Sequence, residues 1–395
     1  MTPETSRLME PMLIPVGTVE LEDRAFDLIQ RASAIGARVP GTVRAGIGDL
    51  VRSINCYYSN LIEGHNTHPR DIDRALKNDY STDPEKRDLQ AEAVAHIHVQ
   101  RLIDRREDAP AAVTSVEYTA WLHREFYERL PENLRWVVNP ETSERLRVEP
   151  GEWRDRSVVV GRHVPPRPEH LRDFMNRFAE AYDPRGMSKT QQVIAVAAAH
   201  HRFSWIHPFL DGNGRVARLM SHAWLARLDV GDSLWSVARG LARTSDRYKA
   251  LLIVADEPRR HDTDGRGTLS QAGFIEFCKF FLDTCIDQVA FMERLLEPTT
   301  LVERIQRYVE SAGAKGEIHP RAFTLLRDAL LMGKVERSAA AALLGVTDRQ
   351  ARTIVAALLD RGFLQSAGPG APLGLAFPPA AVDAWFPTLY PEPLG

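Results

Sequence analysis

Apolar residues recur every three or four positions through most of residues 21–296, which is the spacing that places them on one face of an α-helix. Short polar stretches with proline, glycine and capping residues separate these segments, as expected where one helix ends and the next begins. We therefore predict a mainly α protein. The expected helices span residues 21–35, 43–62, 72–76, 89–103, 115–130, 168–182, 191–205, 214–228, 245–255 and 271–296.

The pattern turns extended at about residues 145–166. The β-branched run at 157–160 is typical of a short strand, and Gly161, Pro165 and Pro166 end it. We predict a short β-hairpin here. A plain structural hairpin fits these residues almost as well as one with a role in binding.

A different pattern occupies residues 298–395. A short alanine-rich helix is predicted at 338–344 and Gly345 ends it, while Thr347, with Gln350 three residues later, forms a capping box that begins the next helix. A strand and a loop rich in proline and glycine follow. Helix, glycine turn and capped helix, followed by a strand and loop, predict a winged-helix domain, which is a variant of the helix-turn-helix.

The charge of this domain bears on its partner. Residues 317–395 hold seven basic and seven acidic residues, whereas DNA phosphates favour a basic face. Arg349 and Arg352 are the side chains that would reach a groove of DNA. We expect protein docking or homodimerisation ahead of DNA binding, and we keep a nucleotide-sensing, DNA-binding transcriptional regulator as the alternative function of the chain.

The whole chain has 395 residues, enough for two or three domains, and a formal net charge of −3 that gives no global attraction to nucleic acid or anionic membranes. Three cysteines without CxxC spacing indicate neither a disulfide framework nor a zinc site. The first residues lack a signal segment, and no run approaches membrane-spanning length. We expect a cytoplasmic protein with no membrane partner.

The residues that carry chemistry are concentrated at 207–218, which read His-Pro-Phe-Leu-Asp-Gly-Asn-Gly-Arg-Val-Ala-Arg. One predicted helix ends before Pro208, and the next begins at about Gly214. The unsatisfied N–H groups at the start of that second helix form a site for an anion such as phosphate. Arg215 and Arg218 share one face of this helix, so we predict that both guanidinium groups reach the same polyphosphate.

Asp211 and His207 complete this predicted site. Asp211 would repel a polyphosphate unless a cation intervened, so we predict a Mg²⁺ ion shared between its carboxylate and the phosphate oxygens. His207 has an unperturbed pKa of about 6.5 and can accept a proton from a hydroxyl near neutral pH. The alternative, an ordinary helix end and surface turn, does not explain why all these residues occur together.

Residues 207–218 resemble the signature of the Fic family, His-x-Phe-x-(Asp or Glu)-Gly-Asn-Gly-Arg-x-x-Arg, at every specified position. The resemblance implies a helical bundle with a hairpin flap and a protein adenylyltransferase, which transfers AMP from ATP to a Ser, Thr or Tyr hydroxyl of a target protein and, as a side reaction, of itself. It implies His207 as the catalytic base and Asp211 as the ligand of Mg²⁺. The implied nucleotide-binding residues are Phe209, Gly212, Asn213, Gly214, Arg215 and Arg218.

A second segment, Ser-Asn-Leu-Ile-Glu-Gly from Ser59 to Gly64, resembles the inhibitory motif of the same family, (Ser or Thr)-x-x-x-Glu-(Gly or Asn). Ser59 and Glu63 lie four positions apart on one helix face, and Gly64 fits the position that ends that helix. The resemblance implies that Glu63 pairs with Arg218 where the γ-phosphate would bind, so that the enzyme is inhibited by default. In some members this glutamate helps to remove AMP, so de-AMPylation and transfer of another nucleotide are alternatives.

The resemblance also implies a domain order. Residues 1–110 would form an N-terminal helical region that carries the inhibitory helix at about 43–64. Residues 111–297 would form the Fic catalytic core, with a flap at about 145–166 that docks the target protein by main-chain pairing, and residues 298–395 the winged-helix domain. Tyr248 falls where Fic proteins often carry a tyrosine near the nucleotide base, although a structural tyrosine is the favoured interpretation.

Overall fold

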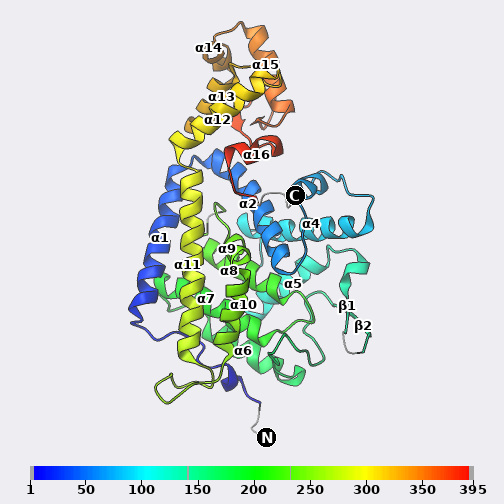
Figure 1. Ribbon diagram of the computed structural model, residues 1–395, viewed down its shortest axis with the longest axis vertical. Coiled ribbons are helices and arrows are strands. Elements are labelled where there is room, and N and C mark those ends of the chain that lie inside the picture. The colour runs from blue at the N-terminus through cyan, green and yellow to red at the C-terminus, as the bar shows by residue number, and fades with distance from the viewer. Residues whose placement is uncertain (1–3, 140–141, 232, 391–395) are drawn as a thin grey trace. The chain divides into compact units, whose positions relative to one another are not determined.

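The computed structural model describes residues 4–139, 142–231 and 233–390 (Figure 1). These residues are mainly helical, as the apolar spacing predicted, with two short antiparallel two-stranded sheets. Within them the chain divides into two compact units, one of residues 1–32, 55–232 and 236–288 and the other of residues 33–54, 233–235 and 289–395. The three-domain division expected from the sequence stays a prediction. No described helix is long and apolar enough to cross a membrane.

The first unit contains, wholly or in part, eleven described helices. They are α1 (Val19–Arg38), α2 (Gly41–Ile62), α3 (Pro69–Ala75), α4 (Pro84–Asp104), α5 (Val116–Tyr127), α6 (Leu171–Ala181), α7 (Lys189–Ile206), α8 (Asn213–Arg227), α9 (Val237–Arg243), α10 (Ser245–Asp256) and α11 (Gln271–Leu295). The α-helices predicted from the apolar spacing are all present, with ends that differ by a few residues. The seven-residue helix α9 was not predicted.

Helices α7 and α8 are the central pair of this unit. Ser188 and Gln191 form a capping box that starts α7. The alanines at 197–199 are fully buried, and small side chains let two helices approach closely, so α7 packs extensively against α8. Helices α4 and α5 pack against α8, and α6 packs against α7. The junction between α7 and α8, which carries the predicted site, is therefore held from several sides.

The paired hairpin of this unit lies earlier than predicted. Strand β1 (Trp136–Val138) pairs with β2 (Arg145–Arg147) in antiparallel register, with Val137 opposite Leu146. Leu146 is buried and its neighbours on β2 are exposed, which is the alternation expected of a strand with one covered face. Only β2 of this hairpin falls within the predicted flap at 145–166.

The strand predicted at 157–160 does not form. Instead Val160 and His163 make a single antiparallel bridge around a tight turn. Pairing cannot extend beyond this bridge because Pro165 and Pro166 have no N–H group to donate. We keep the name flap for residues 145–166, and we call residues 160–164 the flap turn.

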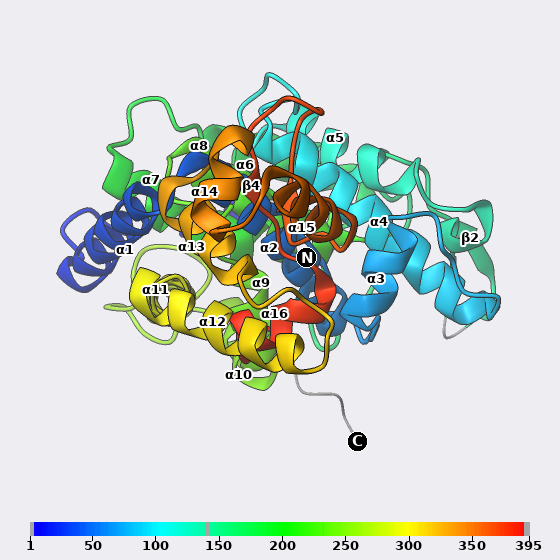
Figure 2. The ribbon, with the colours of Figure 1, turned by 90° about the horizontal axis from the view of Figure 1, so that it is seen from above.

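The second unit contains α12 (Pro298–Ala314), α13 (Ala322–Met332), α14 (Ala340–Leu344), α15 (Asp348–Asp360), α16 (Pro379–Trp385), β3 (Leu364–Gln365) and β4 (Gly374–Leu375). Helices α12 and α16 lie side by side in both views (Figures 1 and 2). Gly345 ends α14 with a left-handed backbone, and Thr347 and Gln350 form the capping box that begins α15. The predicted helix, glycine turn and capped helix are thus confirmed, whereas the assignment as a winged-helix domain and the partner of this unit stay predictions.

Candidate active site

His207 is placed where α7 ends. Its backbone adopts the left-handed conformation, with φ of +50° and ψ of +59°, and its N–H donates to the carbonyl oxygen of Phe203 at 3.0 Å. Burial, reinforced by the positive charge of Arg154, lowers the pKa of His207 to about 4. The imidazole is therefore neutral at pH 7 and has a ring nitrogen that can accept a proton, and its role as the base stays a prediction.

The loop after His207 is closed by Asn213. The side-chain amide of this residue accepts from the N–H of Phe209 at 2.9 Å and donates to the carbonyl oxygen of the same residue at 2.8 Å. At Gly212, where φ is +80°, a Cβ atom would lie 2.8 Å from the ring of Tyr127. The loop is consequently held in a fixed conformation by hydrogen bonds just before the N-terminus of α8. Glycine is required at position 212 because its φ is positive and because a side chain would collide with Tyr127.

Phe209 supports this loop from within the protein. Its side chain is fully buried and stacks on the ring of His123, with ring centroids 4.0 Å apart. His123 accepts the N–H of Gly151 through Nδ1 at 2.8 Å, so Nε2 is the protonated nitrogen that donates to the carbonyl oxygen of Asp211 at 3.2 Å. Phe209 was predicted as a nucleotide-binding residue, and the structure gives it a packing role beneath the loop.

Arg218 meets the predicted inhibitory motif. Its Nε donates to Oγ of Ser59 at 2.8 Å, and its Nη2 donates both to the carbonyl oxygen of Ser59 at 3.2 Å and to Oε1 of Glu63. Burial alone would raise the pKa of Glu63, but the charges of Arg218 and Arg215 outweigh it and the pKa is lowered. Gly64 takes a φ of +88° just after the end of α2, as predicted. The contact implied by the resemblance is therefore present.

Glu63 also lies against the first turn of α8. A Cβ atom at Gly214 would lie 2.5 Å from Oε1 of Glu63 and 3.1 Å from Nη1 of Arg218. Only glycine leaves room for the carboxylate at this point, which is the helix N-terminus where an anion is favoured. Glu63 thus occupies the position where the sequence predicts a phosphate group.

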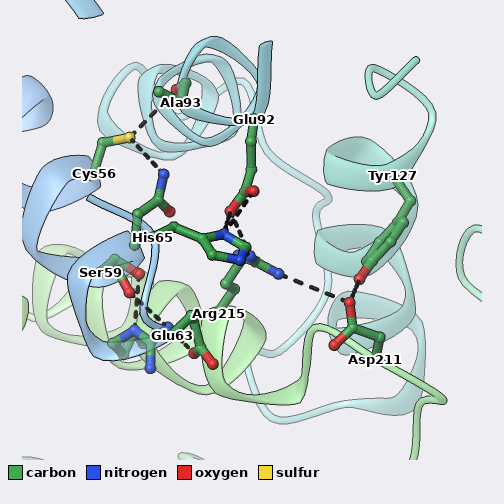
Figure 3. A network of polar contacts seen from close by, with 11 residues as sticks. Cys56, Ser59, Glu63, His65, Glu92, Ala93, Tyr127, Asp211 and Arg215 are labelled. Atoms are coloured by element: carbon green, nitrogen blue, oxygen red, sulfur yellow. Dashed lines mark hydrogen bonds and ion pairs between the residues drawn. The ribbon is translucent and has the colours of Figure 1, made fainter. Parts of the chain in front are cut away.

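Arg215 has a carboxylate partner of its own, and the prediction that both arginines reach the same anion stays a prediction. Its Nη2 donates to Oε1 of Glu92 on α4, and its Nη1 lies 4.0 Å from Oδ2 of Asp211 (Figure 3). Burial is the largest influence and opposes the charge of Arg215, but Glu92 and the other acidic groups nearby together outweigh it and raise the pKa of the guanidinium. The sequence did not predict that the buried carboxylate of Glu92 would be the partner of Arg215.

Glu92 also binds His65, which follows directly after the inhibitory motif. Its Oε2 lies 2.9 Å from Nδ1 of His65, and this hydrogen bond raises the pKa of the imidazole against the opposing effect of burial. Tyr127 on α5 donates its hydroxyl to Oδ2 of Asp211 at 2.5 Å (Figure 3). The only sequence signal for Glu92 is a carboxylate within the apolar stretch of α4, and none marks Tyr127.

Some of the predicted site residues border a cleft of about 790 Å³, whereas Phe209, Asp211, Gly212 and Arg215 are not among its lining residues. Its walls come from the flap turn, the end of α7, the first turn of α8 and the side of α10, and they include Glu63, His207, Asn213, Gly214, Arg218 and Tyr248. The hydroxyl of Tyr248 lies 2.7 Å from Nε2 of His200. A cleft of this size with a few polar groups converging on it is typical of a small-molecule site.

The comparisons with known proteins agree with this arrangement. Residues 113–225 match the Fic/DOC family. Over 80 residues, or 20% of this chain, the sequence is 42% identical to the protein adenylyltransferase Fic of Drosophila willistoni and 42% identical to that of Drosophila virilis, and the match spans only 16% of the length of either protein.

A solved structure extends the likeness beyond this segment. The fold resembles the crystal structure of a Fic family protein from Desulfovibrio desulfuricans G20, with a TM-score of 0.52 and 16% sequence identity over 92% of this chain and 97% of that one. At this identity the likeness concerns the fold alone. Residues 113–225 therefore match the Fic/DOC family, and the fold of the chain is similar to that of a Fic family protein.

Proposed function

We propose that this protein is an adenylyltransferase that moves AMP from ATP to a Ser, Thr or Tyr hydroxyl of a target protein and that it is inhibited by Glu63. The observation that carries the proposal is the position of Arg218. This arginine lies in the second turn of α8 and borders the same cleft as the neutral His207, and its guanidinium is bound by a carboxylate of the same chain.

The cleft offers a triphosphate two kinds of contact. The N–H groups of the first turn of α8 favour an anion, and Gly214 allows it to approach the main chain. Arg218 supplies a cation with several parallel donors, which suits a terminal phosphate. When Glu63 holds that cation, the γ-phosphate loses its partner and meets a carboxylate instead, so ATP is bound less well or in an unproductive position.

His207 would perform the proton transfer. The target hydroxyl gives its proton to the imidazole as its oxygen attacks the α-phosphorus of ATP, the new oxygen–phosphorus bond forms, and the bond to the β-phosphate bridging oxygen breaks to release pyrophosphate. Placing the hydroxyl oxygen in line with the α-phosphorus and the leaving bridging oxygen, with the base within hydrogen-bond reach of the hydroxyl, supplies much of the rate enhancement.

Asp211 fits the role of a magnesium ligand. Its side chain is 46% exposed, and the described contacts engage only Oδ2, so Oδ1 is available to a cation. Mg²⁺ favours carboxylate and phosphate oxygens, and when bound it would neutralise charge on the phosphates and on the leaving pyrophosphate.

The flap turn is the surface on which a target would dock. Val159 and Val164 are each 67% exposed although both are β-branched apolar residues, and the flap turn borders the cleft. An extended segment of the target could pair with the main chain here, because little of this edge is paired within the chain. Its hydroxyl would then face His207.

Transfer of label from ATP tests the proposal. We expect Glu63→Gly to increase AMP transfer to target or to the protein itself by on the order of 10-fold or more, and His207→Ala in the same background to abolish it. Glu107→Gly is the matched control because Glu107 is an exposed carboxylate just after the end of α4. Equal labelling of the parent and the Glu63 variant would contradict inhibition, and labelling that survives in the His207 variant would contradict the assigned base.

Removal of AMP is the second function that the site favours. Glu63 is 33% exposed in the cleft and bonds Arg218 through Oε1. Its other oxygen could orient a water molecule for attack on an AMP-modified side chain. Incubating an AMP-modified target with the parent and with Glu63→Gly separates the two functions, because release of AMP should require Glu63 whereas transfer should be inhibited by it.

A further inference from the structure

Arg154 is a buried arginine whose side-chain partners are main-chain carbonyl groups. Only 4% of the surface of Arg154 is exposed to solvent. Nε donates to the carbonyl oxygen of His207 at 2.8 Å, Nη1 to that of Arg156 at 2.9 Å, and Nη2 to that of Pro166. Its own main-chain N–H donates to the carbonyl oxygen of Pro208 at 2.9 Å. One side chain thus ties both sides of the flap turn to the loop that carries His207.

The guanidinium of Arg154 has no carboxylate at ion-pair distance among the described residues, although the charge of Glu4 acts on it from farther away and raises its pKa. The buried Arg215, by contrast, has Glu92. Burial lowers the pKa of Arg154 to about 10, so the group is still a cation at neutral pH. A buried and unpaired cation costs free energy, which an apolar residue at this position would avoid. The hydrogen bonds that the guanidinium of Arg154 makes to main-chain carbonyl groups therefore indicate its role.

The main chain of His207 adopts an unfavourable conformation that hydrogen bonds from neighbouring groups can hold in place. A residue with a side chain rarely adopts φ of +50°, because its Cβ crowds the following carbonyl group. The hydrogen bond from Arg154 fixes that carbonyl group, and with it the direction in which the imidazole leaves the main chain. On the other side, Nε2 of His163 lies 2.7 Å from the carbonyl oxygen of Trp205 and anchors the flap turn to the end of α7.

We propose that Arg154 is a positioning residue that fixes the base His207 relative to the flap on which the target docks. This inference rests on the proposed adenylyl transfer for its catalytic meaning, because the separation of flap and base decides whether a docked hydroxyl reaches the imidazole. The nucleotide contacts at Gly214 and Arg218 do not involve Arg154. Its loss should therefore lower the rate of the chemical step and leave the binding of ATP unchanged.

Arg154 also sets the electrostatic surroundings of His207. The charged and titratable groups around this imidazole are Arg154 and His163 from the flap and Asp211 from the loop. Arg154 favours the neutral imidazole, so removing its charge should raise the pKa of His207, whereas lysine should preserve it. Charge and geometry can therefore be separated by two substitutions at one position.

The experiment compares three variants in the Glu63→Gly background. Arg154→Met removes both the charge and the donors, and Arg154→Lys keeps the charge but loses the planar arrangement of donors. Arg156→Met is the matched control, because Arg156 lies two residues away and its exposed side chain pairs with Asp155 and Glu144. If the methionine variant fails to fold, the lysine variant, which retains the buried cation, still tests the contacts.

We expect kcat to fall about 10- to 100-fold in both Arg154 variants, with the KM for ATP changed by less than about 3-fold. In a plot of kcat against pH, the fall at low pH, which we attribute to protonation of His207, should move to higher pH in Arg154→Met and stay in place in Arg154→Lys. A rise in the KM for ATP that accounts for the loss would overturn the proposal. So would an equal loss of kcat in Arg156→Met.

Two measurements on the unligated protein test Arg154 without any reaction. Hydrogen exchange at residues 207–211 should be faster in Arg154→Met than in the Arg156 control, and the NMR titration of His207 should shift to higher pH. Unchanged exchange together with an unchanged titration would overturn the positioning role. If both change as expected while the background protein modifies no target, the proposed function fails and the positioning of His207 stands.

Discussion

Arg215 and Arg218 lie three residues apart on α8, and each forms an ion pair with one glutamate. Glu92 on α4 pairs with Arg215, and Glu63, just after the end of α2, pairs with Arg218. The pair of Arg215 and Glu92 is closed to solvent, with side chains 7% and 8% exposed. In the pair of Arg218 and Glu63, the arginine is 2% exposed but the glutamate is 33% exposed and borders the cleft. The two pairs share their chemistry and differ in access.

This difference separates a structural contact from one that a ligand can replace. A phosphate group cannot reach Arg215 without breaking a buried pair, which leaves an uncompensated charge inside the protein. It can reach Arg218 by displacing a carboxylate that already faces water. The spacing of the two arginines predicts the same task for both, and we propose that Arg218 performs it while Arg215 supports the start of α8.

The comparison is tested most strongly by removing each glutamate charge in turn. Glu92→Gln should lower the free energy of unfolding by about 3 kcal/mol, because Arg215 stays buried without a counter-charge. Glu63→Gln should lower it by less than about 1 kcal/mol, because Oγ and the carbonyl oxygen of Ser59 still accept hydrogen bonds from Arg218 and the lost carboxylate was partly exposed. The midpoints of urea unfolding of the two variants measure the difference. Equal losses would mean that both pairs are structural.

Nucleotide binding gives a smaller effect that bears on Arg218 alone. In the Glu63→Gly background, Arg218→Ala should weaken ATP binding by about 10- to 100-fold, as expected for one lost charge-assisted contact. ADP, which has no γ-phosphate, should bind almost equally to both proteins. Calorimetric titration with each nucleotide measures this. A similar loss for ADP would show that Arg218 contacts a phosphate other than the terminal one.

The smallest expected effect concerns His65, whose imidazole forms a hydrogen bond with Glu92, the partner of Arg215. The pKa of His65 is raised above its usual value by its hydrogen bond to Glu92. Its contribution to stability is therefore fully present below about pH 6.5 and is lost as the pH rises through the raised pKa. Because the imidazole is 40% exposed, we expect less than about 1 kcal/mol.

The measurement for His65 is the free energy of unfolding of the parent and of His65→Ala at pH 6 and at pH 9. The difference between the two proteins should be larger at pH 6. A difference that does not depend on pH would show that His65 acts by packing and that the imidazolium contributes nothing to this pair.

The sequence predicted those parts of the site that depend on local order. The end of α7 and the start of α8 follow from spacing and from the motif at 207–218, whereas the contact of Glu63 with Arg218 was implied only by the resemblance to the Fic family. Helix α12 was not predicted, although Leu301, Ile305 and Val309 recur at helical spacing and are buried.

The partners of the loop could not be predicted in the same way. Glu92, Tyr127 and Arg154 reach it from positions between 53 and 123 residues away along the chain. Glutamate, tyrosine and arginine are common on exposed surfaces, and nothing in their immediate neighbours distinguishes one that is folded against a distant loop. Their roles come from tertiary packing, which a local pattern does not encode.

The double hydrogen bond of Asn213 to Phe209 has a consequence for the speed of regulation. Because it closes the loop before any nucleotide arrives, activation need not wait for a segment to fold, and little binding energy is spent on ordering it. Under the proposed inhibition, what has to move is the side chain of Glu63, and partly exposed side chains change rotamer within nanoseconds. The delay between a signal and the first turnover would then be set by the event that frees this side chain.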